Sequence, residues 1–426
     1  MNRKILFLAS RFPFPVTNGR DKTLTEYLSF FKDKKVELLF CYFGKEEIDS
    51  QRIKELSQRI GINFSNVVYC RLPSLLYVLY NVFFHSIILK RLSLQESLFF
   101  SSRIETVLDD LYLSFQPDII ICDMIRSAQY FQKYRNKNVL KIFDMDDILS
   151  RRYKYLSENN SKNIIGNFSK NLPKFADYLI NNIFNRRILN LEAKLVQKRE
   201  VILSKSFDKV ILVSPKEADI LRGWLNSDSK VFSVYPSAEY NYLIDQRGKE
   251  AFSICFMGLL NVPHNEHALM TFFENIFPSL ITRIPQIRFY IIGGGVSQTL
   301  LQYQSSYPDN VKFTGFVDDY SVYLLKSKAF IAPIYFGTGI KLKILDAMAL
   351  GLPVVTTSIG AEGLIVRNNT DILIRDDYTG FIEAIYDLLN DDNYSNKVGE
   401  NAQKYIREYH DYHKLRNLFL EILEIN

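Results

Sequence analysis

The sequence predicts an α/β protein with two doubly wound domains, each built around a parallel β-sheet. Its 426 residues exceed the size that a single hydrophobic core usually serves, so two domains are expected. In both halves, apolar strand-like runs alternate with helix-like segments, which is typical of repeated β-α-β units. A polar stretch over residues 236–250 separates the halves. Because its Pro236 and Gly248 break regular structure, it is the predicted linker.

The first domain is expected over residues 1–235. Its predicted strands read KILFLAS, VELLFCYF, PDIIICD, VLKIFDMDD and KVILVSP, at residues 4–10, 36–43, 117–123, 139–147 and 209–215. A helix is predicted over 23–31, and a long helical stretch through residue 113 follows the second strand. A polar, helical insertion is expected over 150–206. This order favours a parallel sheet with crossover helices.

The second domain is expected over residues 251–404 and repeats the alternation. Its predicted strands read FSICFMGLL, RFYIIGGG, VKFTGFV, AFIAPIYF and PVVTT, beginning at residues 252, 288, 311, 329 and 353. Predicted helices lie between them, at 265–282, 296–303 and 320–327. The tail is helical in pattern, and a helix over about 405–426 is expected to pack back on the first domain.

Composition and charge exclude several classes of protein. The formal net charge is +6, but Lys and Arg are scattered, which suits anionic small molecules or a membrane surface better than nucleic acid. The four cysteines lie in or beside apolar runs without CxxC spacing, so neither a disulfide framework nor a zinc site is expected. The first ten residues hold too few apolar positions for a signal-peptide core. A cytoplasmic location is therefore expected.

The segment over residues 72–90, LPSLLYVLYNVFFHSIILK, is strongly apolar but is interrupted by polar residues and is short for a membrane span. Two alternatives follow. The segment forms buried core helices of the first domain, or it lies on a membrane surface as a peripheral contact. The flanking Arg71, Lys90 and Arg91 and the many aromatic residues favour the second alternative.

Residues 337–355, GTGIKLKILDAMALGLPVV, have the pattern of a helix start that binds an anion. A glycine turn follows one predicted strand, and a helix leads to the next, so unpaired backbone N–H groups and the helix dipole would face a phosphate. At about 100° per residue, Gly339, Lys343 and Asp346 share one helix side and Lys341 points away. A diphosphate on the turn would then meet Lys343, with Asp346 accepting hydroxyl hydrogens. The alternative is an ordinary crossover with a surface Lys and Asp.

A series of motifs follows in a specific order along nearly the whole chain. They are PxPxxxG at 13–19, DMDDILS at 144–150, LEAKLVQKRE at 191–200, FDKVILVSPKEADIL at 207–221, FxG at 256–258, NxxA at 265–268, IIGGG at 291–295, FTGFVDD at 313–319 and GAEGL at 360–364. With them, the chain resembles the family-4 retaining glycosyltransferases, in the group 1 glycosyl transferases. This resemblance implies the GT-B fold of two facing Rossmann-like domains.

The resemblance implies a donor site built mainly by the second domain, with one residue from the first. The residues it implies are Gly315, Phe316 and Val317 at the nucleotide base, Gly337, Thr338, Gly339 and Ile340 at the diphosphate and sugar, Asp346 at the ribose hydroxyls, Gly258 in the first loop, and Gly19 near the phosphates. A carboxylate suits the ribose, because it can accept two hydrogens from a vicinal diol.

Two acidic positions depart from the family pattern. Thr338 stands where the resemblance implies the first acid of Glu-x7-Glu, which excludes an essential acid there. Asp346 replaces the second Glu and is one methylene shorter, so the ribose would sit closer or be held differently.

Phosphate neutralisation is a further departure, because the loop at 258–271 has no Arg or Lys. His264 and His267 would be mostly neutral at pH 7, so Lys343 is expected to carry most of the charge. His264 serves either as a helix-start residue, with Asn265 as the N-cap, or as a ligand. In the first domain, Arg20 either steers an anionic group or is solvated.

The acidic cluster Asp144, Asp146 and Asp147 ends a predicted strand in the first, acceptor-binding domain. It allows three roles: binding of acceptor hydroxyls, general base, or capping of the helix that follows. The resemblance implies no protein nucleophile, so the enzyme would position the acceptor and stabilise the leaving diphosphate. No metal or other cofactor is expected, since Lys343 and a helix dipole replace the cation.

The sequence therefore predicts a retaining, metal-independent transferase that moves a hexose-type sugar from a nucleoside diphosphate sugar, UDP or GDP, to a glycan or lipid-linked acceptor. The Lys-, Asn- and Ile-rich composition suggests bacterial capsule or O-antigen assembly at the inner face of the plasma membrane. One alternative is a GT-B sugar-nucleotide epimerase. Another is a degenerate member that binds nucleotide sugar or a partner without turnover.

Overall fold

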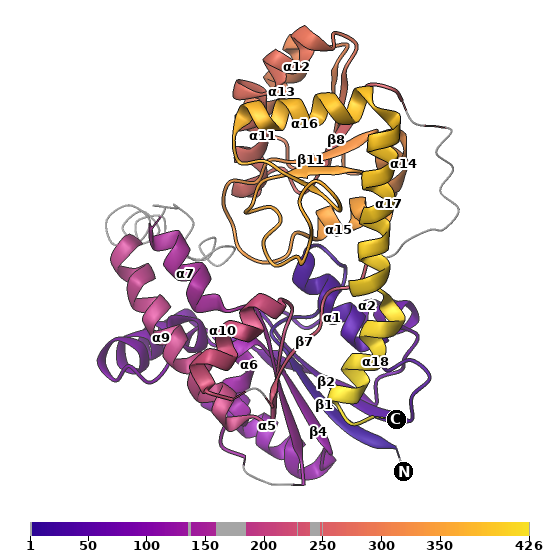
Figure 1. The fold of residues 1–426 in the computed structure, drawn as a ribbon. Coiled ribbons are helices and arrows are strands. Elements are labelled where there is room, and N and C mark those ends of the chain that lie inside the picture. The colour runs from indigo at the N-terminus through magenta and orange to yellow at the C-terminus, as the bar shows by residue number, and fades with distance from the viewer. Residues whose placement is uncertain are drawn as a thin grey trace. The chain divides into compact units, whose positions relative to one another are not determined.

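The structure is a computed structural model that describes residues 2–134, 138–158, 185–227, 229–238, 248 and 250–425. These residues form two compact units (Figure 1). Unit 1 comprises Met1–Val234 and Arg416–Asn426, and unit 2 comprises Tyr235–Leu415. Residues 159–184 of the predicted insertion, and 239–247 and 249 of the predicted linker, lie outside the described residues.

Unit 1 contains a seven-stranded, fully parallel sheet in the order β3-β2-β1-β4-β5-β6-β7. The strands are β1 (Arg3–Ala9), β2 (Val36–Gly44), β3 (Asn66–Arg71), β4 (Ile119–Asp123), β5 (Leu140–Asp146), β6 (Lys209–Leu212) and β7 (Val231–Ser233). Parallel neighbours require crossover connections, which agrees with the alternation in the sequence.

The helices of unit 1 cover both faces of this sheet. They are α1 (Gly19–Ser29), α2 (Ser50–Ile60), α3 (Leu75–Asn81), the π-helix η1 (Val82–Ile88), α4 (Leu94–Ser97), α5 (Ser102–Phe115), α6 (Met124–Phe131), α7 (Leu149–Glu158), α9 (Asn185–Ser206), α10 (Pro215–Leu225) and, from Arg416 on, α18 (Tyr412–Ile422). In Figure 1, α5, α6 and α10 lie on one side of the strands and α1, α2 and α18 on the other. Because both faces are covered, most of the interior strand β1 is buried: Ile5, Leu6, Phe7 and Leu8 have 0% exposure.

Two features of unit 1 differ from the sequence analysis or extend it. Strand β3 lies inside the stretch that was predicted to be helical through residue 113, and this prediction is wrong. β3 lies at the edge of the sheet and is half-exposed, so its apolar run is short. The segments on both sides of it have helical patterns, which concealed the strand. At the other end of the chain, Phe419 of α18 stacks on Tyr27 with ring centroids 4.6 Å apart. Residues 416–426 of the helix expected over about 405–426 thus join unit 1, whereas 405–415 belong to unit 2.

Unit 2 contains a six-stranded parallel sheet in the order β10-β9-β8-β11-β12-β13. Its strands are β8 (Ser253–Met257), β9 (Arg288–Ile292), β10 (Val311–Gly315), β11 (Ala329–Ala332), β12 (Val354–Thr356) and β13 (Leu373–Ile374). Its helices are α11 (Pro263–Asn275), α12 (Phe277–Arg283), α13 (Gln298–Ser306), α14 (Ser321–Lys326), α15 (Leu342–Ala349), α16 (Tyr378–Asn390) and α17 (Asp392–Tyr409). The predicted fold class, two doubly wound parallel-sheet domains, is confirmed.

The strand order predicts where each unit binds ligands. In doubly wound sheets, ligands bind at the carboxyl ends of the strands, where the order reverses. This reversal lies between β1 and β4 in unit 1 and between β8 and β11 in unit 2.

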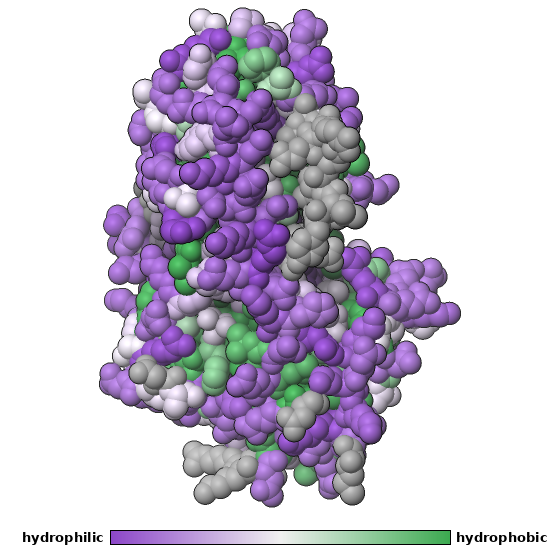
Figure 2. All heavy atoms as spheres, turned by 45° about the vertical axis from the view of Figure 1, so that its right-hand side comes forward, coloured by the Kyte–Doolittle hydropathy of each residue, from purple (hydrophilic) through white to green (hydrophobic). Residues whose placement is uncertain are grey.

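The segment over residues 72–90 forms α3 and η1 and is not core. Nine of its large apolar residues are at least 41% exposed, so the core-helix alternative is wrong. By contrast, the face of the molecule drawn in Figure 2 is mostly hydrophilic, with hydrophobic residues in separate patches. The four cysteines are free and buried, as the sequence predicts.

Candidate functional site

The glycine turn predicted at residues 337–340, which opens the segment 337–355, lies at the reversal point of unit 2. β11 leads into the turn, α15 follows it, and β12 comes next, which confirms the predicted order of elements. Thr338 and Ile340 are half-buried, and Ile340 packs against the core of unit 2. The neighbouring strand β8 ends at Met257, and Gly258 opens the loop after it, so this loop and the turn leave adjacent strands at the same edge.

Lys341 belongs to the turn, contrary to the prediction that it points away. α15 begins at Leu342, so Lys341 is its N-cap residue and Gly339, with a φ of +79°, lies before the helix. The Lys341 ammonium folds back and donates to the carbonyl oxygen of Gly339 at 2.6 Å and to that of Gly337 at 3.5 Å. A positive charge is thus fixed within the turn.

Lys343 contacts two neighbouring elements, α11 and β8. Its Nζ donates to Oδ1 of Asn265 in α11 and lies 4.4 Å from the ring centroid of Phe256 in β8. Gly258 leaves room for this arrangement, because a Cβ atom there would lie 3.2 Å from Nζ of Lys343 and 2.8 Å from Nδ2 of Asn265. The ammonium therefore has a defined position next to the end of β8.

Asn265 is not the N-cap of its helix. α11 begins two residues earlier, with Val262 as N-cap and Pro263 as the first residue, a position where proline is preferred. The Asn265 amide instead donates to the Leu259 carbonyl at 2.8 Å and accepts from Lys343. His264 lies in the first turn of α11, as expected. Its ring also adjoins the glycine turn, since a Cβ on Gly337 would lie 3.9 Å from its Cγ.

Positive charge is crowded at this edge. Burial, followed by the charge of Lys341, lowers the pKa of Lys343 to about 7. Burial, Lys343 and Lys341 lower the pKa of His264 to about 3, so this ring is neutral at pH 7. An anion on the turn would relieve the repulsion and restore the charge of Lys343. The arrangement therefore suits a phosphate group.

The other predicted donor residues lie on neighbouring loops of unit 2. The backbone N–H of Gly293 donates to the Gly315 carbonyl at 3.0 Å, and a Cβ on Gly293 would lie 2.0 Å from the carbonyl oxygen of Gly258. The ends of β8, β9 and β10 are thus in contact. Phe316 follows and is 82% exposed, whereas Val317 packs partly on the core.

Asp346 lies on the second turn of α15, and the hydroxyl of Tyr320 donates to its Oδ2 at 3.5 Å. Neither Tyr320 nor the contact of Asn265 with Lys343 was predicted from the sequence. Asn265 opens the NxxA motif but was expected to be an N-cap, and Tyr320 directly follows the FTGFVDD motif, which was the one signal for it.

A second cluster lies at the reversal point of unit 1, around Arg20 in the first turn of α1, directly after Gly19. The buried Arg20 is neither solvated nor open to an anion, because three carboxylates surround it. Its Nη2 lies 2.5 Å from Asp123 and 2.5 Å from Asp144, and its Nη1 lies 3.0 Å from Asp146. Asp123 was missed, although it ends PDIIICD and pairs with Asp144 in the register of β4 and β5.

The three predicted acids of this cluster do not act as one group. Asp146 has a φ of +69° at a register shift, so Asp144 and Asp146 reach Arg20, whereas Asp147 pairs with Arg152. Capping of the following helix is not their role: Glu200 of α9 accepts from Ser150 N at 3.1 Å and Ser150 Oγ at 2.6 Å.

The carboxylates of the cluster differ in charge. Burial raises the pKa of Asp144 to about 7, although Arg20 opposes it, and burial also raises the pKa of Asp146. For Asp123, Arg20 and the Ser10 N–H at 2.7 Å outweigh burial and hold the pKa below its ordinary value. Within the described residues, Asp144 Oδ1 has no hydrogen-bond partner. Asp144 is therefore partly protonated at neutral pH. In the part of the chain that the structure describes, no group of three or more His, Cys, Asp or Glu is arranged to hold a metal ion.

Comparisons with known proteins bear on the family and the fold. Residues 251–391 match the family model described as glycosyl transferases group 1. A Klebsiella pneumoniae protein described as an uncharacterized 44.6 kDa protein in the cps region is 25% identical over 420 residues, which cover 97% of each chain.

Solved structures are similar over almost the whole chain. Anabaena HepE in complex with UDP and glucose superposes with a TM-score of 0.62 at 15% identity, covering 99% of this chain and all of that one. The sucrose-phosphate synthase of Thermosynechococcus elongatus gives a TM-score of 0.64 at 14% identity, covering 99% and 98%. The GT-B fold is thus confirmed, and the region that matches the glycosyl transferases group 1 model lies in unit 2.

Proposed function

We propose that this chain is a retaining glycosyltransferase that moves a hexose-type sugar from UDP-sugar or GDP-sugar to a glycan or lipid-linked acceptor. The group 1 domain and the GT-B fold support transfer of a sugar. Similarity to a protein described from a cps region supports a role in capsule polysaccharide, and UDP in the Anabaena structure supports a nucleoside diphosphate donor. O-antigen assembly is the alternative setting, and we place the reaction at the inner face of the plasma membrane.

One observation carries this proposal: the crowding of Lys341 and Lys343 around the turn at Gly337 and Gly339. Two basic side chains beside a helix start form a strong site for a diphosphate, because backbone N–H groups and the helix dipole add to the charges. These groups would stabilise the leaving diphosphate as negative charge develops on it, without a metal ion.

The rest of the donor would follow from this anchor. The exposed Phe316 offers an aromatic face for the base, and Asp346 with Tyr320 offers oxygens for the ribose hydroxyls. Thr338 would contact the sugar through its hydroxyl.

On the acceptor side, we assign different roles to the acids of unit 1. The side chain of Asp146 is 18% exposed, whereas those of Asp123 and Asp144 are fully buried. Asp146 is therefore the acid that can bind an acceptor hydroxyl. Arg20, Asp123 and Asp144 hold it in place, and the partly protonated Asp144 is a reservoir for the proton that the acceptor loses.

The proposal is tested by titration calorimetry of the full chain with UDP, GDP, dTDP and ADP, with and without EDTA. We expect saturable, EDTA-insensitive binding of one nucleotide. Lys343→Ala should weaken it about 100-fold, since a charge-assisted contact is lost. The matched control is Lys312→Ala, an exposed lysine of β10 in the same unit, which should bind normally.

Turnover separates the alternatives. Release of the nucleotide from the matching nucleotide sugar, with retention of anomeric configuration in the product, would support the transferase. Binding without any release would favour the non-catalytic alternative, and conversion to an epimeric nucleotide sugar would favour the epimerase. Absence of binding by all four nucleotides would overturn the diphosphate site.

A further inference from the structure

The segment formed by α3 and η1 presents an apolar surface that remains exposed among the described residues of unit 1. Nine of its large apolar side chains are between 41% and 80% exposed. These residues are Leu75, Leu76, Leu79, Tyr80, Phe83, Phe84, Ile87, Ile88 and Leu89, called here the apolar face. Single exposed apolar residues are normal in proteins, but a contiguous set of this size marks an interaction surface.

The opposite side of the segment is polar and buried, which is the reverse of an ordinary surface helix. Asn81 and Ser86 have 0% exposure. The Asn81 amide donates to the Phe100 carbonyl at 2.8 Å, and the hydroxyls of Ser86 and Ser97 are 2.8 Å apart. The segment is therefore fixed to unit 1 by hydrogen bonds, and its apolar face is turned outward.

The π-helix explains how both polar residues reach the same side. In a regular α-helix, residues five positions apart differ by about 140° around the axis. In η1 the bonds span five residues, as between Leu89 N and Phe84 O at 2.9 Å, and this widens the turn. Asn81 and Ser86 consequently both contact Ser97 of α4.

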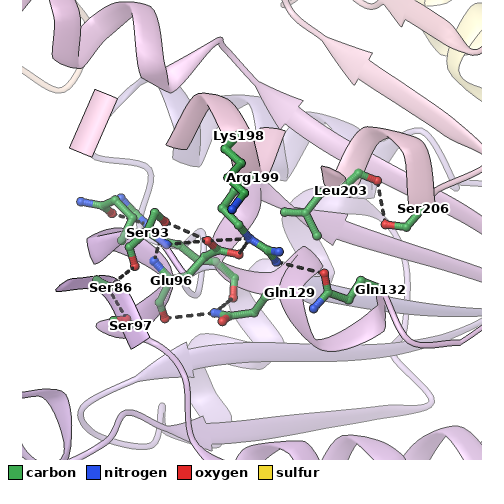
Figure 3. A network of polar contacts seen from close by, with 12 residues as sticks. Ser86, Ser93, Glu96, Ser97, Gln129, Gln132, Lys198, Arg199, Leu203 and Ser206 are labelled. Carbon is green, nitrogen blue, oxygen red and sulfur yellow. Dashed lines mark hydrogen bonds and ion pairs between the residues drawn. The ribbon is translucent and has the colours of Figure 1, made fainter. Parts of the chain in front are cut away.

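A buried network of ion pairs and hydrogen bonds fixes α4 to α9 and α6 (Figure 3). Ser93 and Glu96 form a capping box at the start of α4, and Glu96 also accepts from Nε of Arg199 in α9 at 2.8 Å. Arg199 further donates to Gln132 at 3.0 Å. Because each charge in this network is paired, the support beneath the apolar face is rigid.

The rim of the apolar face is basic. Lys90 and Arg91 directly follow it and are exposed, and the exposed Lys198 of α9 donates to the Lys90 carbonyl at 3.5 Å. Residues 72–95 contain no Asp or Glu. An apolar, aromatic face with a rim of one charge sign complements an anionic lipid surface, where such helices lie in the plane of the membrane. No helix among the described residues is long and apolar enough to cross a membrane.

We propose that α3 and η1 dock this chain on an anionic lipid bilayer, with the apolar face at the acyl boundary and Lys90, Arg91 and Lys198 at the headgroups. This inference rests on the proposed placement at a membrane but not on the proposed reaction. The docking surface belongs to unit 1, whereas the diphosphate site belongs to unit 2. Each can therefore fail while the other stands.

The test is co-sedimentation of the full chain with vesicles of phosphatidylcholine, with and without about one third phosphatidylglycerol. We expect binding to the anionic vesicles that weakens at high salt. The double variant Leu76→Glu/Phe83→Glu should lower the partition coefficient about tenfold or more, because two charges would enter the acyl boundary. Lys90→Glu/Arg91→Glu should abolish the preference for anionic vesicles.

The matched control is Leu113→Glu, which alters a residue of α5 that is 69% exposed in the same unit. It should bind vesicles like the unaltered chain. Nucleotide binding and the melting temperature should be unchanged in all variants, since every altered residue is exposed. Equal binding by the Leu76/Phe83 double variant would overturn the proposal. Absence of vesicle binding by the unaltered chain would also overturn it. This includes the outcome in which sedimentation shows that the apolar face joins two copies of the chain.

Discussion

The two units have the same topology at their reversal points but opposite charge. At the edge of unit 2, Lys341 and Lys343 crowd around a glycine turn, and the pKa of Lys343 falls. At the edge of unit 1, three carboxylates surround Arg20, and the pKa of Asp144 rises. One sheet order therefore supports opposite chemistries, because the loops and not the sheet supply the charges. The excess of positive charge suits a diphosphate, and the excess of negative charge suits hydroxyl groups.

The largest effect should come from removing the charge at the centre of the acidic cluster. Arg20→Ala would leave buried carboxylates unpaired and should lower the free energy of unfolding by about 3–5 kcal/mol. The measurement is urea unfolding at pH 7. Arg283→Ala, which breaks a surface pair with Glu383, is the control and should cost about 1 kcal/mol or less. A loss for Arg20→Ala as small as this control would show that the cluster does not depend on its arginine.

The two units should also differ in how stability depends on pH. The pKa of Asp144 is raised to about 7, so the folded state binds the proton more tightly than the unfolded state. The stabilisation from this group is complete below about pH 4 and is lost as the pH rises to 7. The pKa of Lys343 is lowered to about 7, so its contribution has the opposite sign. Stability from this group rises as the pH goes from about 7 to 10.

Unfolding midpoints as a function of pH test these signs. Asp144→Asn should flatten the fall in stability between pH 4 and 7, and Lys343→Ala should flatten the rise between pH 7 and 10. Each change should be on the order of 1 kcal/mol or more across its window. If stability changes with pH in both variants as it does in the unaltered chain, neither group has the pKa that its burial implies.

Proton uptake sharpens the comparison for unit 2. At pH 8 most free Lys343 is neutral, so binding of a nucleoside diphosphate should take up nearly one proton as the anion restores its charge. At pH 6 the uptake through Lys343 should be close to zero. Calorimetry in two buffers of different ionisation enthalpy measures this number. Lys343→Ala should show no uptake at pH 8, and an unchanged value in this variant would assign the proton to another group.

The smallest effect is expected at Tyr320. Its hydroxyl lies 3.5 Å from Oδ2 of Asp346, at the limit of a hydrogen bond, so Tyr320→Phe should weaken nucleotide binding by about threefold at most. Asp346→Ala, which removes the proposed ribose acceptor itself, should weaken it by about tenfold. A larger loss from Tyr320→Phe than from Asp346→Ala would reverse the proposed order of roles.

The sequence by itself determined the fold class and the position of the glycine turn at residues 337–340. The reason is that both are encoded locally: alternation of strands and helices sets a parallel sheet, and glycines followed by an apolar helix set the turn. Local signals also pointed to Lys343 and to the acidic residues at the end of β5 as candidate site residues. They predicted the wrong helix start where two residues could each begin the helix. Asn265 was expected to be the N-cap, but α11 begins at Pro263.

Only the tertiary structure decided which side chains meet and what charge they carry. Asp123 and Asp144 are 21 residues apart in sequence and face Arg20 together only because β4 and β5 pair in register. The apolar pattern of residues 72–90 predicts a face but not what covers it, and the buried contacts of Asn81 and Ser86 turn that face outward. Burial lowers the pKa of Lys343, and burial depends on packing by distant segments, which no local pattern records.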